Sequence, residues 1–326
     1  MPVLLGLLIL VAASTVQAQE TPEAYLVDRM PYAAFDRLPA MQIVVPRGKI
    51  VVGIAPGPLD LPHARLLDWI ERCANVVARY YGRFPARDTR LLVVPRAGRG
   101  VSGGRAWGHR GAAVRITIGE HATEAELERD WILVHELTHL AFPSVSGRHR
   151  WIEEGLASYV EPVARAQAGQ LDPREVWSEL AAGLPKGLPQ AGDRGLDHTP
   201  TWGRIYWGGA LFALLSDLEI RRQTQNRLGL QDALRAILAA GNIEMASPLE
   251  PLLEIGDRAT GARVLGALYA RMKDQPAPVD LDALWGALGV WPEGGTVRFD
   301  DAAPLAATRQ AITAPPPAPA FRGGRP

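Results

Sequence analysis

One short motif limits what this chain can be more than any other feature. His135, Glu136 and His139 form H-E-x-x-H within an apolar stretch, residues 130–140. Residues four positions apart lie on one face of a helix, so both imidazoles can reach one metal ion, with the Glu136 carboxylate beside a water that the metal holds. Two histidines, a further carboxylate and one open position are the ligand pattern of a catalytic zinc site. The motif therefore predicts a single Zn2+ ion bound on a helix.

A second segment, residues 151–160 (WIEEGLASYV), is expected to supply the third protein ligand. Glu153, Glu154 and Glu161 are the candidates. Neighbouring helical positions differ by about 100° in direction, so Glu153 and Glu154 cannot both face the histidines. Pro162 is expected to end or kink the helix. We therefore expect Glu161 on the surface.

The two segments together resemble the gluzincin metallopeptidases, whose third zinc ligand is a glutamate on the helix that follows H-E-x-x-H. They are most similar to the aminopeptidase-N and glycyl-aminopeptidase group, in which the second motif reads N-E-G-F-A-S-Y-V-E. Aligned in this way, Glu154 lies at the ligand position and Glu153 at the neighbouring asparagine. The resemblance covers roughly residues 50–215. It implies an α+β, thermolysin-like zincin domain with a small N-terminal mixed sheet and a C-terminal helical lobe.

The resemblance also implies a reaction, the hydrolysis of peptide bonds in a peptide or protein substrate. Glu136 would act as the general base on a zinc-activated water and pass the proton to the leaving amine. In these peptidases the tyrosine of Y-E-K-G-A donates a hydrogen bond to the oxyanion. Residues 206–210 read Y-W-G-G-A, so Tyr206 is the matching candidate.

One feature of the aminopeptidase-N group is missing. Its edge strand carries G-A-M-E-N, whose glutamate binds the free amine of the substrate. We expect residues 112–118 (AAVRITI) to be the corresponding edge strand, and they contain no acidic residue. Extended peptide substrates would pair with the backbone of such a strand. The missing glutamate argues against an aminopeptidase, although an aminopeptidase of the same fold stays open.

Two other functions use the same residues. A non-catalytic binding protein with the zincin fold is disfavoured, because His135, Glu136, His139 and Glu154 are all present. A zinc hydrolase that acts on another kind of bond is not distinguished from a peptidase. The 35 basic residues equal the 35 acidic ones, so overall charge does not suggest a nucleic-acid partner. Nothing in the sequence indicates an oligomeric state.

The N-terminus predicts export. Residues 3–13 form an apolar run too short to cross a membrane, and Val16, Gln17 and Ala18 suit signal-peptide cleavage after Ala18. The mature protein would then be periplasmic or secreted, with no stable membrane insertion. No Lys or Arg precedes Arg29, so an uncleaved N-terminal anchor stays open.

The remaining sequence is divided by its composition and periodicity. We predict a signal peptide (1–18), an extended lead-in (19–42), an α/β subdomain with the zinc site (43–165), a mainly helical subdomain (166–313) and a disordered tail (314–326). Residues 96–111 are rich in Gly and Arg, which favours a mobile hairpin or flap over a phosphate site. A capping box at Thr123 predicts one helix from there to about residue 142. The lone Cys73 lies at helical spacing among apolar residues and is expected in the core.

Overall fold

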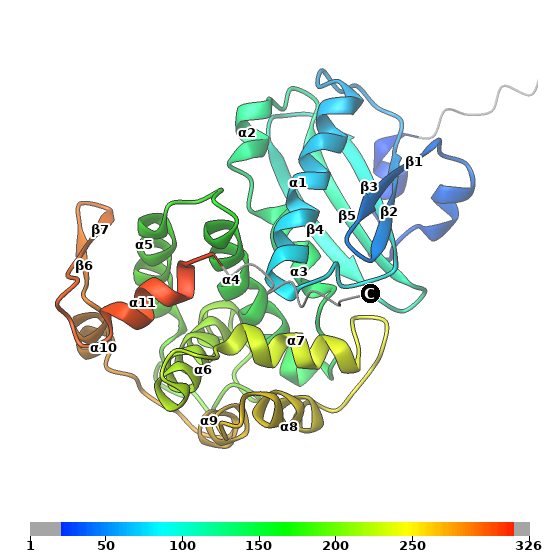
Figure 1. Cartoon of the computed structure of the whole chain (residues 1–326). Helices are drawn as coiled ribbons and strands as arrows, with labels where there is room; N and C mark the ends of the chain where they lie inside the picture. Colours follow the sequence, from blue (N-terminus) through cyan, green and yellow to red (C-terminus); the bar gives the residue numbers. More distant parts are fainter. Residues whose placement is uncertain (1–20, 316–326) are drawn as a thin grey trace, which may run out of the picture.

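The structure is a computed structural model that describes residues 21–315. The first half of this range contains a five-stranded mixed sheet (Figure 1). The strand order is β1-β2-β3-β5-β4. β2, β3 and β5 are parallel, and β1 and β4 pair antiparallel with the two outer members of this set. The strands are β1 (Ala40–Val45), β2 (Gly48–Ile54), β3 (Asp88–Arg96), β4 (Val101–Trp107) and β5 (Ala112–Gly119).

The prediction that residues 112–118 form an edge strand is wrong. β5 pairs with β3 on one side and with β4 on the other, so β4 is the edge. Residues 101–107 of the predicted hairpin or flap are therefore a strand. Gly103 and Gly104 lower the intrinsic β propensity of this segment, and pairing with β5 outweighs that preference.

Both faces of the sheet are covered. Helix α1 (His63–Tyr81) lies on one face, with Cys73 buried in the core as expected. The lead-in packs on the opposite face and is not extended throughout, because residues 22–25 and 32–36 form 3-10 helices. Tyr25 and Met30 are buried there with Leu92 and Val94 of β3.

The helix predicted from Thr123 to residue 142 is broken in two. The capping box forms, but α2 (Glu124–Glu128) ends after little more than one turn. The Asp130 carboxylate then accepts the Leu133 amide N–H at 3.0 Å, and α3 (Ile132–His139) begins. An acceptor placed at a helix start satisfies a backbone N–H group that would otherwise lack a partner. His135 therefore lies in the first turn of a short helix, and His139 is its last residue.

Helix α4 (Arg150–Gln167) runs on past Pro162, which does not end it. The prediction of a surface Glu161 is also wrong: this residue is 2% exposed, and its carboxylate accepts a hydrogen bond from Arg165 at 2.9 Å. Proline removes one helical hydrogen bond. The helix nevertheless continues, because the buried Glu161–Arg165 pair and the packing of α4 against its neighbours stabilise its second half.

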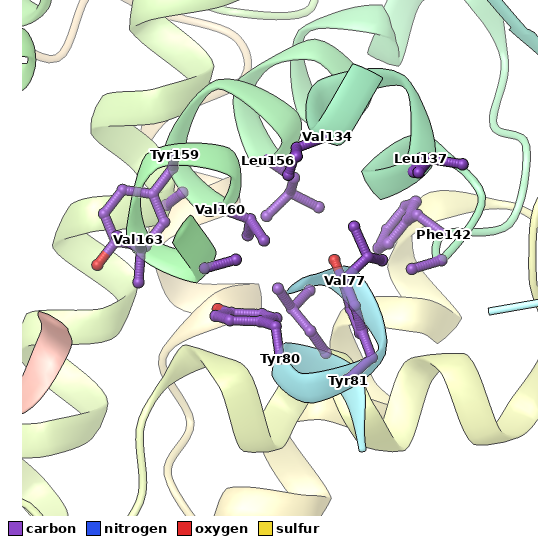
Figure 2. Close-up of a cluster of buried hydrophobic side chains, with 14 of the residues drawn as sticks. Val77, Tyr80, Tyr81, Val134, Leu137, Phe142, Leu156, Tyr159, Val160 and Val163 are labelled. Atoms are coloured by element: carbon purple, nitrogen blue, oxygen red, sulfur yellow. The ribbon is translucent and has the colours of Figure 1, made fainter. Parts of the chain in front are cut away.

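Helices α1, α3 and α4 share one core (Figure 2). Side chains from the last turns of α1 meet side chains from the buried sides of the other two helices. The buried residues labelled there are Val77, Tyr80, Tyr81, Val134, Leu137, Phe142, Leu156, Tyr159, Val160 and Val163. This packing fixes α3 relative to α4, and both carry predicted metal ligands.

A helical lobe follows α4 and lies below the sheet in Figure 1. The lobe consists of α5 (Pro173–Gly183), α6 (Gly209–Thr224), α7 (Leu230–Ala240), α8 (Leu249–Thr260), α9 (Leu265–Met272), α10 (Leu281–Leu288), the hairpin of β6 (Val290–Glu293) and β7 (Thr296–Phe299), and α11 (Ala306–Thr313). The fold class is α+β, as predicted.

The predicted signal peptide and residues 316–326 of the predicted tail lie outside the described residues. Among the helices of residues 21–315, none is both long and apolar enough to cross a membrane.

Candidate metal centre and catalytic cleft

His135, His139 and Glu154 converge on one point between α3 and α4. The Oε2 atom of Glu154 lies 3.4 Å from Nε2 of His135 and 3.4 Å from Nε2 of His139. Ligand atoms at about 2.05 Å from a tetrahedral zinc ion are separated by about 3.4 Å. The donor set and its spacing therefore fit Zn2+. Within residues 21–315 no other group of this kind is present.

The two histidines are held in different surroundings. His135 is buried, with the Trp131 indole edge-on to its ring at 5.5 Å between centroids. Burial lowers the pKa of His135, which favours the neutral imidazole that a metal requires. The His139 ring is edge-on to that of His135 at 4.9 Å. The Nε2 atoms of both imidazoles therefore lie close enough together to bind one metal ion.

Glu154 is oriented by its neighbours. Its Oε1 accepts hydrogen bonds from Nε and Nη2 of Arg150 at 3.3 and 3.1 Å, which leaves Oε2 facing the histidines. Burial by itself raises the pKa of Glu154, but hydrogen bonds from His135 and His139 outweigh it and hold the pKa below its usual range. Glu153 points elsewhere, since its Oε1 accepts the Val145 amide N–H at 3.2 Å. Of the two adjacent glutamates, only Glu154 therefore faces the histidines.

Glu136 lies beside the metal ligands in a cleft of about 920 Å³. It is 9% exposed, and burial raises its pKa to about 7. A carboxylate with a pKa near neutrality can both accept and return a proton at physiological pH. The wall of the cleft next to Glu136 is the edge strand β4, with Gly104 in direct contact with the side chain.

Tyr206 also lines this cleft. Its ring stacks beside that of His135 at 6.5 Å, and its hydroxyl interacts with Arg150 and Glu154. Tyr206 belongs to a π-helical turn (Arg204–Gly208) just before α6, a distortion often found at functional sites. A Cβ at Gly155 would lie 2.3 Å from Cα of Gly209, so α4 and α6 touch and bring this turn to Glu154. All five predicted site residues therefore line one cleft.

No protein-family model and no curated protein sequence matches the chain. Its structure is similar to that of an aminopeptidase N family protein from Idiomarina loihiensis, with a TM-score of 0.58 at 15% identity over 78% of this chain and 49% of that one. It is also similar to a point mutant of an M1 zinc metallopeptidase from Deinococcus radiodurans, with a TM-score of 0.50 at 17% identity over 74% and 53%. The fold is therefore similar to that of aminopeptidase N family proteins, as the sequence resemblance implies. The chain spans about half the length of these structures.

One buried cluster of polar side chains beside the start of α4 was not predicted from the sequence. Asp197 accepts hydrogen bonds from Trp151 Nε1 and Tyr269 Oη at 2.8 Å each, and pairs with His149 Nδ1 at 3.1 Å. These contacts join the start of α4 to α9. Asp197 lies 46 residues or more from each partner along the chain, so no local sequence pattern predicts these contacts.

We expect Asp197→Ala to lower the free energy of unfolding by at least about 2 kcal/mol, because three largely buried donors lose their acceptor. Thermal or urea unfolding of the zinc-free protein measures this without a contribution from bound metal. Asp274→Ala is the control, since Asp274 forms only solvent-exposed pairs, with His198 and Lys273, and it should cost less than about 0.5 kcal/mol. Equal effects of the two substitutions would contradict the role given to Asp197.

Gly104 is a second residue that the sequence did not single out. A Cβ at this position would lie 2.4 Å from Cγ of Glu136, whereas a Cβ at Gly103 would meet nothing within 4 Å. We expect Gly104→Ala to displace the Glu136 carboxylate and to lower kcat by about 10- to 100-fold with zinc content unchanged. Gly103→Ala should keep kcat within about two-fold. Steady-state kinetics with metal analysis checks both, and a fully active Gly104→Ala protein would contradict the contact.

Proposed function

We propose that this chain is a zinc-dependent metallopeptidase that hydrolyses peptide bonds. The convergence of two imidazoles and one carboxylate at tetrahedral zinc spacing, beside a buried carboxylate in an open cleft, is the observation that supports this most strongly. The aminopeptidase-like fold is in agreement with it.

In this proposal His135, His139 and Glu154 hold the zinc, which when bound polarises the scissile carbonyl and increases the acidity of water. Glu136 accepts the proton of the attacking water and delivers it to the leaving nitrogen. Its raised pKa suits both transfers. Tyr206 donates a hydrogen bond from its hydroxyl group to the oxyanion, an effect worth about 3 kcal/mol per donor in other enzymes.

The substrate is proposed to bind along β4, which replaces residues 112–118 as the edge strand. One side of β4 pairs with β5, so its other side leaves backbone groups for an extended peptide. β4 reads VSGGRAW and carries no carboxylate to bind a free amine. We therefore propose that cleavage does not require a free N-terminus, although the first structural relative is described as an aminopeptidase N family protein.

Peptide digestion by the purified protein tests this function. Matched libraries with free and N-acetylated termini are incubated with the zinc-loaded protein, with the protein plus chelator, and with the chelated protein after zinc is restored. We expect cleavage of both libraries, loss with chelator and recovery with zinc. Cleavage of the free-terminus library alone would favour the aminopeptidase alternative. No zinc-dependent cleavage of either library would contradict the proposal.

The location of the protein and the class of its partner are proposed from the sequence alone. We propose that it is exported, on the basis of the apolar run before Ala18, and that its partner is a peptide or protein rather than a nucleic acid. Mass spectrometry of the protein recovered from the producing cells should show a chain that begins at Gln19, either as glutamine or as its cyclised pyroglutamate form. A first residue of Met1 would favour the uncleaved anchor.

A further inference from the structure

Arg150 is the cleft residue that the proposed mechanism leaves without a role towards substrate. It begins α4, one turn before Glu154, and lines the cleft. Its Nε and Nη2 donate to Glu154 Oε1, and the guanidinium also interacts with the Tyr206 hydroxyl. A guanidinium has five N–H donors, so at least two stay available. The side chain is 56% exposed, which makes those donors accessible from the cleft.

The charges that line the cleft favour an anionic ligand at this place. Its carboxylates are Glu136, Glu153 and Glu154, and its guanidiniums are Arg105 and Arg150. Glu154 faces the metal position, Glu136 is the proposed base, and Glu153 is bonded to the Val145 amide. A bound divalent ion together with the two guanidiniums outweighs these three carboxylates. A substrate ammonium group would therefore meet net repulsion near Arg150, whereas a carboxylate would be attracted.

We propose that Arg150 is a specificity-determining residue that binds a carboxylate of the substrate next to the scissile bond. The inference rests on the proposed peptidase function and deepens it. Arginine suits the task, since its planar fork can donate two parallel hydrogen bonds to one carboxylate. The carboxylate can belong to the C-terminus of a short peptide or to an Asp or Glu side chain within a longer one.

Three kinds of peptide separate these sources. They are N-acetylated pentaalanine as the free acid, the same peptide as the C-terminal amide, and a series of amides in which one alanine at a time is replaced by glutamate. We expect zinc-loaded wild-type protein to prefer the free acid or one of the glutamate amides over the plain amide by about 10-fold or more in kcat/KM, as expected for hydrogen bonds between charged groups. The preferred peptide identifies which carboxylate is bound.

The substitution Arg150→Leu should bring this ratio close to one. Arg105→Leu is the matched control. It removes the other guanidinium of the cleft, which adds to the positive charge but is not the proposed hydrogen-bond donor, and it should keep most of the ratio. Arg150→Lys keeps the charge but not the fork and should retain only part of the preference. Zinc content is measured in every variant, since Arg150 also orients Glu154.

Binding measured by calorimetry makes the test independent of turnover. The zinc-loaded Glu136→Gln protein is titrated with the free acid, the plain amide and the glutamate amides, with and without Arg150→Leu. Tighter binding of a carboxylate-bearing peptide that depends on Arg150 supports the proposal even when no peptide is hydrolysed, in which case only the peptidase function fails. Equal binding of all the peptides, or a preference that survives in Arg150→Leu, would overturn it.

Discussion

Glu136→Gln is expected to lower kcat by about a thousand-fold while zinc content stays at one ion per chain. Glutamine fits the same buried position against Gly104 but cannot accept a proton, so general-base catalysis is lost. The metal ligands are untouched, because Glu136 is not one of the three groups that converge. Steady-state hydrolysis of a fluorogenic peptide gives the rate, and plasma emission gives the zinc.

Two controls make this result specific. Glu153→Gln changes a neighbouring carboxylate that bonds to Val145 rather than to the metal position, and its effect on kcat should be less than about 10-fold. A melting temperature within a few degrees of wild type shows that the domain is folded. Hydrolysis retained by Glu136→Gln would refute its assignment as the base.

His139→Ala is expected to lose both zinc and turnover. Removing a side chain that contacts an ion directly should cost more than the roughly 10- to 100-fold in affinity typical of groups that only support a ligand. Competition with a chromogenic chelator measures the affinity. The matched control is His63→Ala, which removes an exposed histidine at the start of α1 and should leave zinc affinity unchanged. Unchanged zinc content in His139→Ala would contradict its role as a ligand.

The parts of the site that depend on local spacing could be predicted from the sequence. His135 and His139 share a helix face whether the helix begins at Thr123 or, as the structure has it, at Ile132. Glu154 followed from the resemblance, and its distance from the histidines agrees with that alignment. Tyr206 was found by a three-residue match and does line the cleft.

Features that depend on distant contacts could not be predicted. β4 is a strand because β5 lies beside it, although its glycines favour a loop. Glu161 is buried because α4 is covered on both sides, which no local pattern reveals. Asp197 links segments that are far apart in the sequence, and Gly104 matters only because Glu136 lies against it.

The convergence of three side chains on one zinc ion is tested most directly by a crystal structure of the zinc-loaded protein, with anomalous data collected on both sides of the zinc edge. We predict one peak between α3 and α4, at about 2.0–2.2 Å from His135 Nε2, His139 Nε2 and Glu154 Oε2. A peak at another place, or a Glu154 carboxylate turned away from the two imidazoles, would contradict the account.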